Sequence, residues 1–389
     1  MPSSATRYVL IACAFLLAGC FGPPNRDLIF TPPIKAPASA IAATHEIFVA
    51  TTRARSDRPA EVFSGARSPV TSFASVEVTV PAIHKTGVIE RPKPGQRPDP
   101  AKVFVAESVT LYGNPKAFTN ALRTDIAAHD GRAVVFVHGY NTGFDSAIYR
   151  MTQLVQDSGF PGTPILFTWA SGGKTVDYVY DNNSATAARD SLEQTLKIVK
   201  RAGAKRIDII AHSMGNWVVM EALRQLAIEG DRDLGNTLGD VVLASPDIDV
   251  DVFKAQMRRY GKPDKPFAVL ISDDDKALRI ASFIAGDRPR VGDYHNTKEL
   301  AELGVIVVDL TNIPAGDRLN HTKFADNPLL VKILGDRLAN SDSGAGGADG
   351  ATLTRRINGL ARGLGQTVGS TADIVITTPF EVLRIAVGR

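Results

Sequence analysis

Short apolar runs recur along most of the chain, separated by stretches in which apolar residues recur every three or four positions. Continuous runs of four or five apolar residues are typical of strands buried on both faces of a parallel sheet. They predict strands at 134–137, 165–168, 207–210, 241–244, 267–271 and 305–309, after two earlier strands at 46–49 and 75–80. Helical periodicity predicts helices at 185–201 and 216–228. This alternation predicts an α/β fold with a mostly parallel, doubly wound sheet that has helices on both faces.

The N-terminus departs from this pattern. Arg7 precedes an apolar stretch of 11 residues, Tyr8 to Ala18, which is the arrangement of a secretory signal peptide. The stretch ends in Leu17-Ala18-Gly19-Cys20, which resembles the bacterial lipobox. The resemblance implies cleavage before Cys20, with lipid attached to its thiol and to the new amine. We therefore expect a signal peptide at 1–19 and a lipid anchor at Cys20, with an unlipidated secretory signal as the alternative.

Composition divides the remainder of the chain into four parts. The segment 20–43 carries five prolines, which is typical of an extended tether. We expect a globular domain at 44–340, then a linker rich in Gly, Ser and Ala at 341–350. A basic tail at 351–389 has apolar residues at helical spacing, among them Leu353 and Leu364. The sequence leaves open whether this tail docks on the domain, lies on a membrane or stays disordered.

Charge and cysteine content exclude several classes of protein. A formal net charge of +3 is too small to indicate a nucleic-acid partner, which needs a concentrated basic face. No apolar run reaches the roughly 18 residues needed for a transmembrane helix. Cys13 and Cys20 are the only cysteines, so the mature domain has no disulfide, no thiol nucleophile and no cysteine metal site. We found no phosphate-binding glycine loop and no metal-ligand cluster, so we expect no cofactor and no metal.

The segment from Ile207 to Asn216 carries the main chemical signal. A buried-strand pattern runs into Ala211-His212-Ser213-Met214-Gly215 and then into a predicted helix. This is the context of the G-x-S-x-G nucleophile elbow, in which small residues flank the serine because strand and helix nearly touch there. Ala211 replaces the first glycine of that pattern, a departure of one methyl group. We interpret Ser213 as a nucleophile; the simpler alternative is a serine that only caps the helix.

A second segment, Val134 to Asn141, reads as a buried strand that ends in His138-Gly139-Tyr140. In α/β hydrolases the loop after this strand gives one backbone N–H to the oxyanion hole, and the residue after the nucleophile gives the other. These amides belong by position to Tyr140 and Met214. We interpret His138 as structural, holding the loop by hydrogen bonds, and not as a catalytic base.

A serine nucleophile needs a base and an orienting acid, and in this fold they follow the serine in the order acid, then histidine. After Ser213 only His295 and His321 remain, and His321 lies beyond the last predicted strand, where the fold puts its base. Asp275 is the expected acid, because it follows strand 267–271 directly before a helical run; Asp273 and Asp274 then read as turn and cap residues. Asp247 or Asp249, one strand earlier, is the alternative acid.

These motifs together resemble a bacterial α/β-hydrolase family of unknown function, which is esterase-like and often consists of lipoproteins. The resemblance covers about Glu46 to Leu338. It rests on Ala50-Thr51-Thr52-Arg53, Val80-Pro81 with His84 and Gly87, His138-Gly139-Tyr140-Asn141, Phe167-Thr168-Trp169, Ala211 to Gly215, Ser245 to Asp249, Asp275 to Leu278, and His321. It implies the hydrolase fold and a Ser213–Asp275–His321 triad, but it does not name a substrate.

The sequence therefore predicts a lipid-anchored serine hydrolase that acts on ester or thioester bonds through an acyl-enzyme. Its partners would be an ester or lipid-like small molecule and, through the anchor, a membrane of the bacterial envelope. Tyr140, Tyr178 and Tyr180 are candidate pocket residues or ordinary loop anchors. The alternative function is a catalytically idle hydrolase scaffold that serves as an envelope interaction module.

Overall fold

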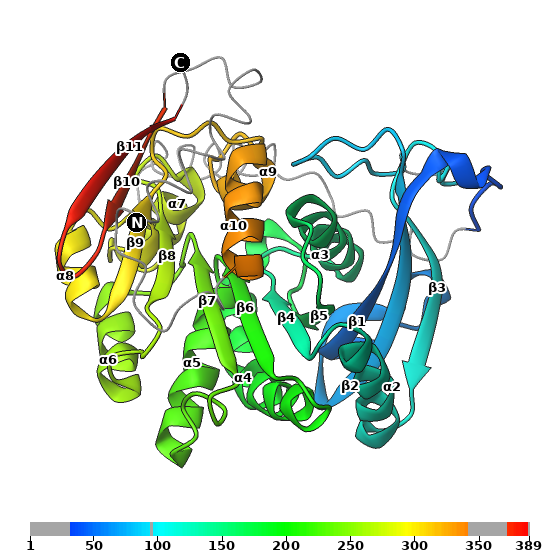
Figure 1. The fold of residues 1–389 in the computed structure, drawn as a ribbon, viewed down its shortest axis with the longest axis horizontal. Helices are drawn as coiled ribbons and strands as arrows, with labels where there is room; N and C mark the ends of the chain where they lie inside the picture. Colours follow the sequence, from blue (N-terminus) through cyan, green and yellow to red (C-terminus); the bar gives the residue numbers. More distant parts are fainter. Residues whose placement is uncertain (1–31, 94–95, 341–371, 388–389) are drawn as a thin grey trace, which may run out of the picture.

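The computed structural model describes residues 32–93, 96–340 and 372–387. Within these ranges, 11 strands form one sheet in the order β11-β10-β9-β8-β7-β6-β4-β5-β1-β2-β3 (Figure 1). The strands are β1 Ile41–Arg55, β2 Phe63–Pro81, β3 Val105–Tyr112, β4 Arg132–Val137, β5 Thr163–Thr168, β6 Arg206–His212, β7 Leu238–Ala244, β8 Phe267–Ile271, β9 Val305–Asp309, β10 Ala372–Thr377 and β11 Val382–Val387. The helices are α2 Pro115–Ala128, α3 Phe144–Ser158, α4 Tyr178–Arg201, α5 Gly215–Glu229, α6 Val250–Tyr260, α7 Lys276–Ile284, α8 Thr297–Glu302, α9 Lys323–Asp326 and α10 Pro328–Asn340.

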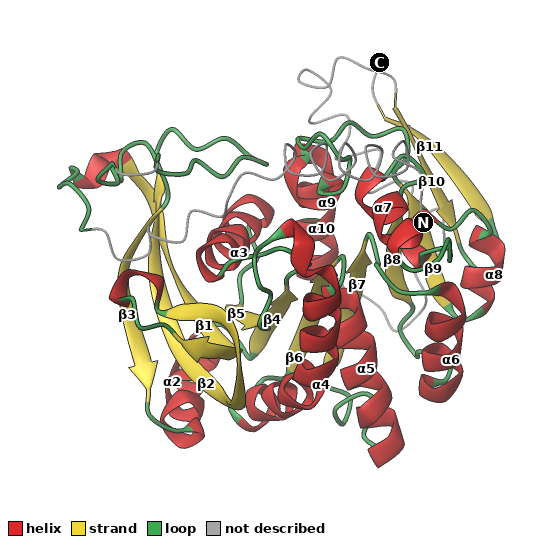
Figure 2. Cartoon of the chain, turned by 180° about the vertical axis from the view of Figure 1, so that it is seen from behind, coloured by secondary structure: helices red, strands yellow, loops and turns green. Residues whose placement is uncertain are grey.

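The central strands are parallel. β1, β5, β4, β6, β7, β8 and β9 pair side by side in one direction. Helices α3 and α10 cover one face of this sheet, and α4 and α5 cover the other, as Figures 1 and 2 show from opposite sides. The predicted doubly wound, mostly parallel α/β fold is therefore confirmed.

Two apolar cores lie on the two faces of the sheet. Successive side chains of a strand point to opposite faces, so Val135 and Val137 of β4 join the core under α2, α4, α5 and α6. Val134 and Phe136 of the same strand join the core under α3 and α10. This double burial explains why the central strands read as continuous apolar runs.

The N-terminal strands extend the sheet beyond β5. β1 pairs parallel with β5 and antiparallel with β2, and β2 pairs antiparallel with β3. β1 and β2 are much longer than the short strands predicted at 46–49 and 75–80. Both continue through segments whose positions are exposed or half-buried, 41–46 in β1 and 64–72 in β2, and which therefore lack a continuous buried run. β3 was not predicted. It is an edge strand whose outward residues, such as Glu107 and Thr110, are polar and interrupt the apolar run.

The C-terminal residues 372–387 dock on the domain. The sequence had left open whether any part of the tail does so. They form a hairpin whose strand β10 pairs antiparallel with β9. Ile374 and Ile376 pack there against Leu329 and Leu330 of α10 in a third, smaller apolar cluster. The segment with helical spacing in the tail lies outside the described residues.

One predicted helix starts earlier than expected, and several predictions lie outside the described residues. The helix predicted to start at residue 185 begins at Tyr178, so the supposed loop before it is partly helical. The signal peptide, Cys20 and the linker at 341–350 lie outside the described residues. Of the helices that the structure describes, none combines the length and apolar content that a bilayer crossing requires.

Candidate active site

Ser213 stands on a sharp turn between β6 and α5. Its backbone lies in the left-handed region, with φ of +53°, a conformation that costs a residue other than glycine about 1–3 kcal/mol. Its amide donates to the carbonyl of Ala244 at the end of β7 (2.9 Å), and its carbonyl accepts from the amide of Asn216 in α5 (3.1 Å). Such strain is retained where the position of one side chain matters, so the turn has the geometry predicted for a nucleophile elbow.

Close packing explains the small residues around Ser213. A Cβ on Gly215 would lie 2.4 Å from the carbonyl oxygen of His138, and a Cβ on Gly139 would lie 2.8 Å from the Cβ of Ser213. The carbonyl oxygen is part of the backbone, and a Cβ is fixed by its own backbone, so neither atom can move aside cheaply and both positions favour glycine. Ala211 is fully buried within β6, where the extra methyl group packs into the core and does not crowd the turn.

The structure brings His321 and Asp275 together beside this turn. The Nδ1 atom of His321 lies 2.7 Å from Oδ2 of Asp275, and the aspartate side chain is fully buried. The carbonyl of His321 accepts from Nε2 of His212, the residue before Ser213 (3.2 Å), and the two imidazole centroids are 4.6 Å apart. His321 therefore lies against the elbow, whereas His295 is exposed at the surface.

Asp275 has two separate hydrogen-bonding roles. Its Oδ1 atom caps α7 by accepting from the amides of Ala277 (3.0 Å) and Leu278 (3.1 Å), which leaves Oδ2 for His321. The expectation that Asp274 caps this helix is therefore wrong. Asp274 instead pairs with the buried ammonium of Lys323 at 2.6 Å.

The two alternative acids make other contacts. Asp249 caps α6, with its Oδ1 accepting from the amide of Asp251 at 2.9 Å. Asp247 is buried, and its carboxylate faces the hydroxyl of Tyr178 (2.9 Å) and Nε of Arg290 (3.2 Å). Burial raises the pKa of Asp247, although Arg290 opposes the shift.

The electrostatic environment of His321 favours its charged form. Burial alone would lower the pKa of His321, but Asp275, helped by the carboxylates of Asp317 and Asp247, raises it above the ordinary value of 6.5. The neighbouring His212 has the opposite shift, since its burial and the nearby His321 lower its pKa well below 6.5. The pair thus consists of one basic imidazole and one that stays neutral.

The two amides expected to form the oxyanion hole have no internal acceptor. Within the described chain, the N–H groups of Tyr140 and Met214 donate to no protein atom. The next two amides in the same loop are occupied: Asn141 donates to Asp181 (3.1 Å) and Thr142 donates to Ser171 (3.0 Å). Unpaired N–H groups beside a strained serine are what a hole for a developing oxyanion requires.

His138 and the tyrosines have structural contacts. His138 is buried and stacks on Trp169, and its two ring nitrogens form hydrogen bonds with Gly139 and Thr168. Burial and the charge of Arg53 lower the pKa of His138 to about 3, so its imidazole is neutral. Tyr140 and Tyr178 pack edge to face, with centroids 5.4 Å apart. Tyr180, in the first turn of α4, instead lies under the guanidinium of Arg67 in β2.

Sequence reasoning missed the buried polar residues beneath the loop after β4. Arg53, Thr168 and Asp181 are at most 1% exposed, and each contacts this loop or His138. Arg53 and Thr168 belong to the motifs of the family resemblance, but the sequence predicted no role for them. The signal that could have revealed Arg53 is a charged residue near the end of the strand pattern of β1.

The family of the chain follows from comparison with known proteins. Residues 114–337, more than half of the chain, match the family model described as alpha/beta hydrolase of unknown function (DUF900). This range contains Ser213, Asp275 and His321. No curated protein matches the sequence. In the part of the chain that the structure describes, no three His, Cys, Asp or Glu side chains are grouped to hold a metal ion. The chain belongs to the DUF900 family of α/β hydrolases.

Proposed function

We propose that the protein is a lipid-anchored serine hydrolase that cleaves carboxylic ester or thioester bonds. The observation that carries the proposal is the hydrogen bond between His321 Nδ1 and Asp275 Oδ2 beside the strained Ser213. If Ser213 only capped α5, or if His321 were an ordinary surface histidine, the strained serine, the imidazole and the buried carboxylate would not need to lie together. The envelope location follows from the lipobox at Cys20 and is part of the same proposal.

In the proposed reaction, Ser213 Oγ attacks the carbonyl carbon of the ester while Nε2 of His321 takes its proton. The carbonyl oxygen becomes an oxyanion, which the amides of Tyr140 and Met214 stabilise. Collapse of this intermediate breaks the ester bond, and the imidazolium returns its proton to the leaving oxygen. Water then attacks the acyl-enzyme with His321 as base, and this step releases the acid and restores Ser213.

Asp275 keeps the imidazole in the required tautomer. A carboxylate on Nδ1 leaves Nε2 unprotonated and free to act as base, and it stabilises the imidazolium that forms during attack.

The test is labelling by a fluorophosphonate probe and turnover of short p-nitrophenyl esters. We expect Ser213→Ala to abolish both while its melting temperature stays close to that of the wild type. Ser191→Ala, in the middle of α4, is the matched control and should label normally. Failure of the wild-type protein to label or turn over esters would instead favour the idle interaction scaffold.

A further inference from the structure

A buried chain of hydrogen bonds leads from Arg53 to the loop after β4. Arg53 Nε donates to the hydroxyl oxygen of Thr168 (2.8 Å), and that hydroxyl lies 2.8 Å from Nε2 of His138. The other ring nitrogen of His138, Nδ1, lies 2.8 Å from the carbonyl oxygen of Gly139. Arg53, His138 and Thr168 come from three different segments of the chain, and all three side chains are buried.

The chemistry of the partners determines which atom donates and which accepts at each link of this hydrogen-bond chain. A carbonyl oxygen can only accept, so Nδ1 of His138 is the protonated nitrogen and Nε2 is the acceptor in the neutral ring. Thr168 already accepts from Arg53, so its own proton is directed to Nε2. Burial and the Arg53 charge keep the pKa of His138 near 3, so the ring stays neutral across the working range of pH.

The last link acts on the peptide unit that contains the Tyr140 amide. The carbonyl of Gly139 and the N–H of Tyr140 belong to one planar trans peptide and point in opposite directions. Holding the carbonyl against His138 therefore aims the N–H away from the buried histidine. A hydrogen bond accepted by the carbonyl also polarises the N–H and makes it a better donor.

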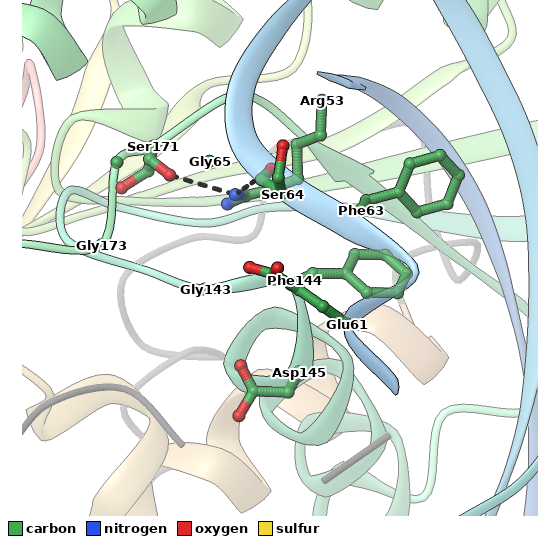
Figure 3. A pocket seen from close by; sticks show the side chains of 11 residues that line it. Arg53, Glu61, Phe63, Ser64, Gly65, Gly143, Phe144, Asp145, Ser171 and Gly173 are labelled. Atoms are coloured by element: carbon green, nitrogen blue, oxygen red, sulfur yellow. Dashed lines mark hydrogen bonds between the residues drawn. The ribbon is translucent and has the colours of Figure 1, made fainter. Parts of the chain in front are cut away.

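The same guanidinium fastens the flanking segments. Arg53 donates to the carbonyls of Thr142 (2.5 Å), Ser171 (3.0 Å) and Ser64 (3.3 Å), and Figure 3 shows it pointing between the last two. The cavity beside it, about 10 Å³, has room for about one water molecule. Rigid support of this kind is what a preorganised catalytic dipole requires.

We propose that Arg53 is a positioning residue of the oxyanion hole, which acts through Thr168 and His138 to orient the Gly139–Tyr140 peptide. This inference rests on the proposed hydrolase function and adds to it the device that aims one of its two amides. Arg53 itself takes no part in bond making. It acts through Thr168 and His138, whose Nε2 lies 3.5 Å from Arg53 Nη2, and through its direct hydrogen bond to the Thr142 carbonyl in the same loop.

The test breaks the chain at Thr168, where a substitution without change of volume is possible. Thr168→Val removes the hydroxyl link, and Thr168→Ser keeps it. Thr163→Val is the matched control, because Thr163 is equally buried at the opposite end of β5 and also uses its hydroxyl, toward Asp125 (2.6 Å). Each variant is assayed for kcat, KM and melting temperature, and for inhibition by a trifluoromethyl ketone, whose enzyme adduct carries an oxyanion.

Losing an oxyanion-hole donor lowers kcat by about 10²–10³-fold, and a misaimed donor should lower it by about 10-fold or more. We expect this loss in Thr168→Val, with an unchanged KM, a matching loss of affinity for the ketone, and recovery of most of the rate in Thr168→Ser. Thr163→Val should have a lower melting temperature but unchanged kcat, KM and affinity for the ketone. Equal kcat in Thr168→Val and Thr163→Val would overturn the inference and leave the proposed function intact, whereas a wild-type protein without turnover would overturn both.

Discussion

Asp275 combines a helix-capping contact with a hydrogen bond to His321, one on each of its two carboxylate oxygens. Oδ1 caps α7 and Oδ2 holds His321, so the start of the helix fixes the carboxylate that would orient the base. Asparagine caps helices about as well as aspartate. A single substitution can therefore separate the two tasks.

We expect Asp275→Asn to keep the fold but lose most of the activity. The amide still caps α7 through its oxygen, whereas the charge that stabilises the imidazolium is gone. Removing such an acid from a related triad has cost about 10⁴-fold in rate. Ester turnover and thermal melting, measured on the same preparation, separate the two effects.

Two other aspartates serve as controls. Asp249→Asn changes another helix-capping aspartate, that of α6, and should leave turnover unchanged. Asp247→Asn disturbs the contacts with Tyr178 and Arg290 and should mainly lower stability. If Asp275→Asn keeps near-wild-type turnover and Asp247→Asn does not, the acid lies one strand earlier and the assignment is wrong.

The raised pKa of His321 predicts where activity is lost in acid. Only the neutral imidazole can accept the proton of Ser213, and the carboxylates around His321 keep it protonated to higher pH than usual. The profile of kcat/KM against pH should therefore rise through a midpoint above 6.5. In Asp275→Asn the midpoint should move to lower pH. A wild-type midpoint below 6.5 would contradict this interpretation.

At the level of elements, a buried ionic contact ties the turn after β2 to α3. The imidazole of His84 lies 2.8 Å from Glu90 and 2.7 Å from Asp157 at the end of α3. Burial alone would lower the pKa of His84, but these two carboxylates raise it above 6.5. Asp157 also accepts from the amide of Gly87 (2.8 Å), so the whole turn is fixed to the helix.

Because the folded pKa of His84 is raised, its contribution to stability is complete below about pH 6.5 and declines as pH rises through the folded value. His84→Gln should therefore lower the melting temperature more at pH 6 than at pH 9. His295→Gln, at an exposed position, is the control. A His84→Gln deficit that is equal at both values of pH would mean that the imidazole is not charged in the folded protein.

The pattern of the sequence predicted the elements buried on both sides and failed at the edges. The central strands β4 to β9 have continuous apolar runs because two cores contact them, and a local pattern is enough to find them. β3 lies at an edge, and β10 pairs with β9, a partner that no local pattern can indicate. The start of α4 was missed because polar residues of its first turns, such as Asp181, are buried by contacts with the loop after β4.

The residues of the candidate site likewise fall into those that a local pattern predicted and those that it could not. The turn at Ser213 and the position of His321 follow from chain order in this fold, so the sequence alone predicted them. Arg53 could not be assigned, because its role depends on Thr168, which lies 115 residues further along the chain. Only the parallel pairing of β1 with β5 brings the two together.

At the level of the whole molecule, the proposed lipid anchor at Cys20 would place the protein at a membrane. We expect Cys20→Ser to move the protein from the membrane fraction to the soluble fraction, or to leave it tethered by an uncleaved signal. Phe21, not aspartate, follows Cys20, so in a Gram-negative host we expect the outer membrane. Cell fractionation and the mass of the intact protein test this, and an identical mass and distribution in the variant would refute lipidation.

The pairing of β1 with β5 also has a consequence for the order of folding. It joins residues about 117 positions apart, and closing so long a loop costs chain entropy before any contact compensates for it. We therefore expect β1 to join the sheet late, after β6 to β9, which position Ser213 and His321, have packed. Arg53 arrives with β1. A partly folded molecule could then hold its triad in place and still lack activity, because the peptide at Tyr140 would not yet be aimed.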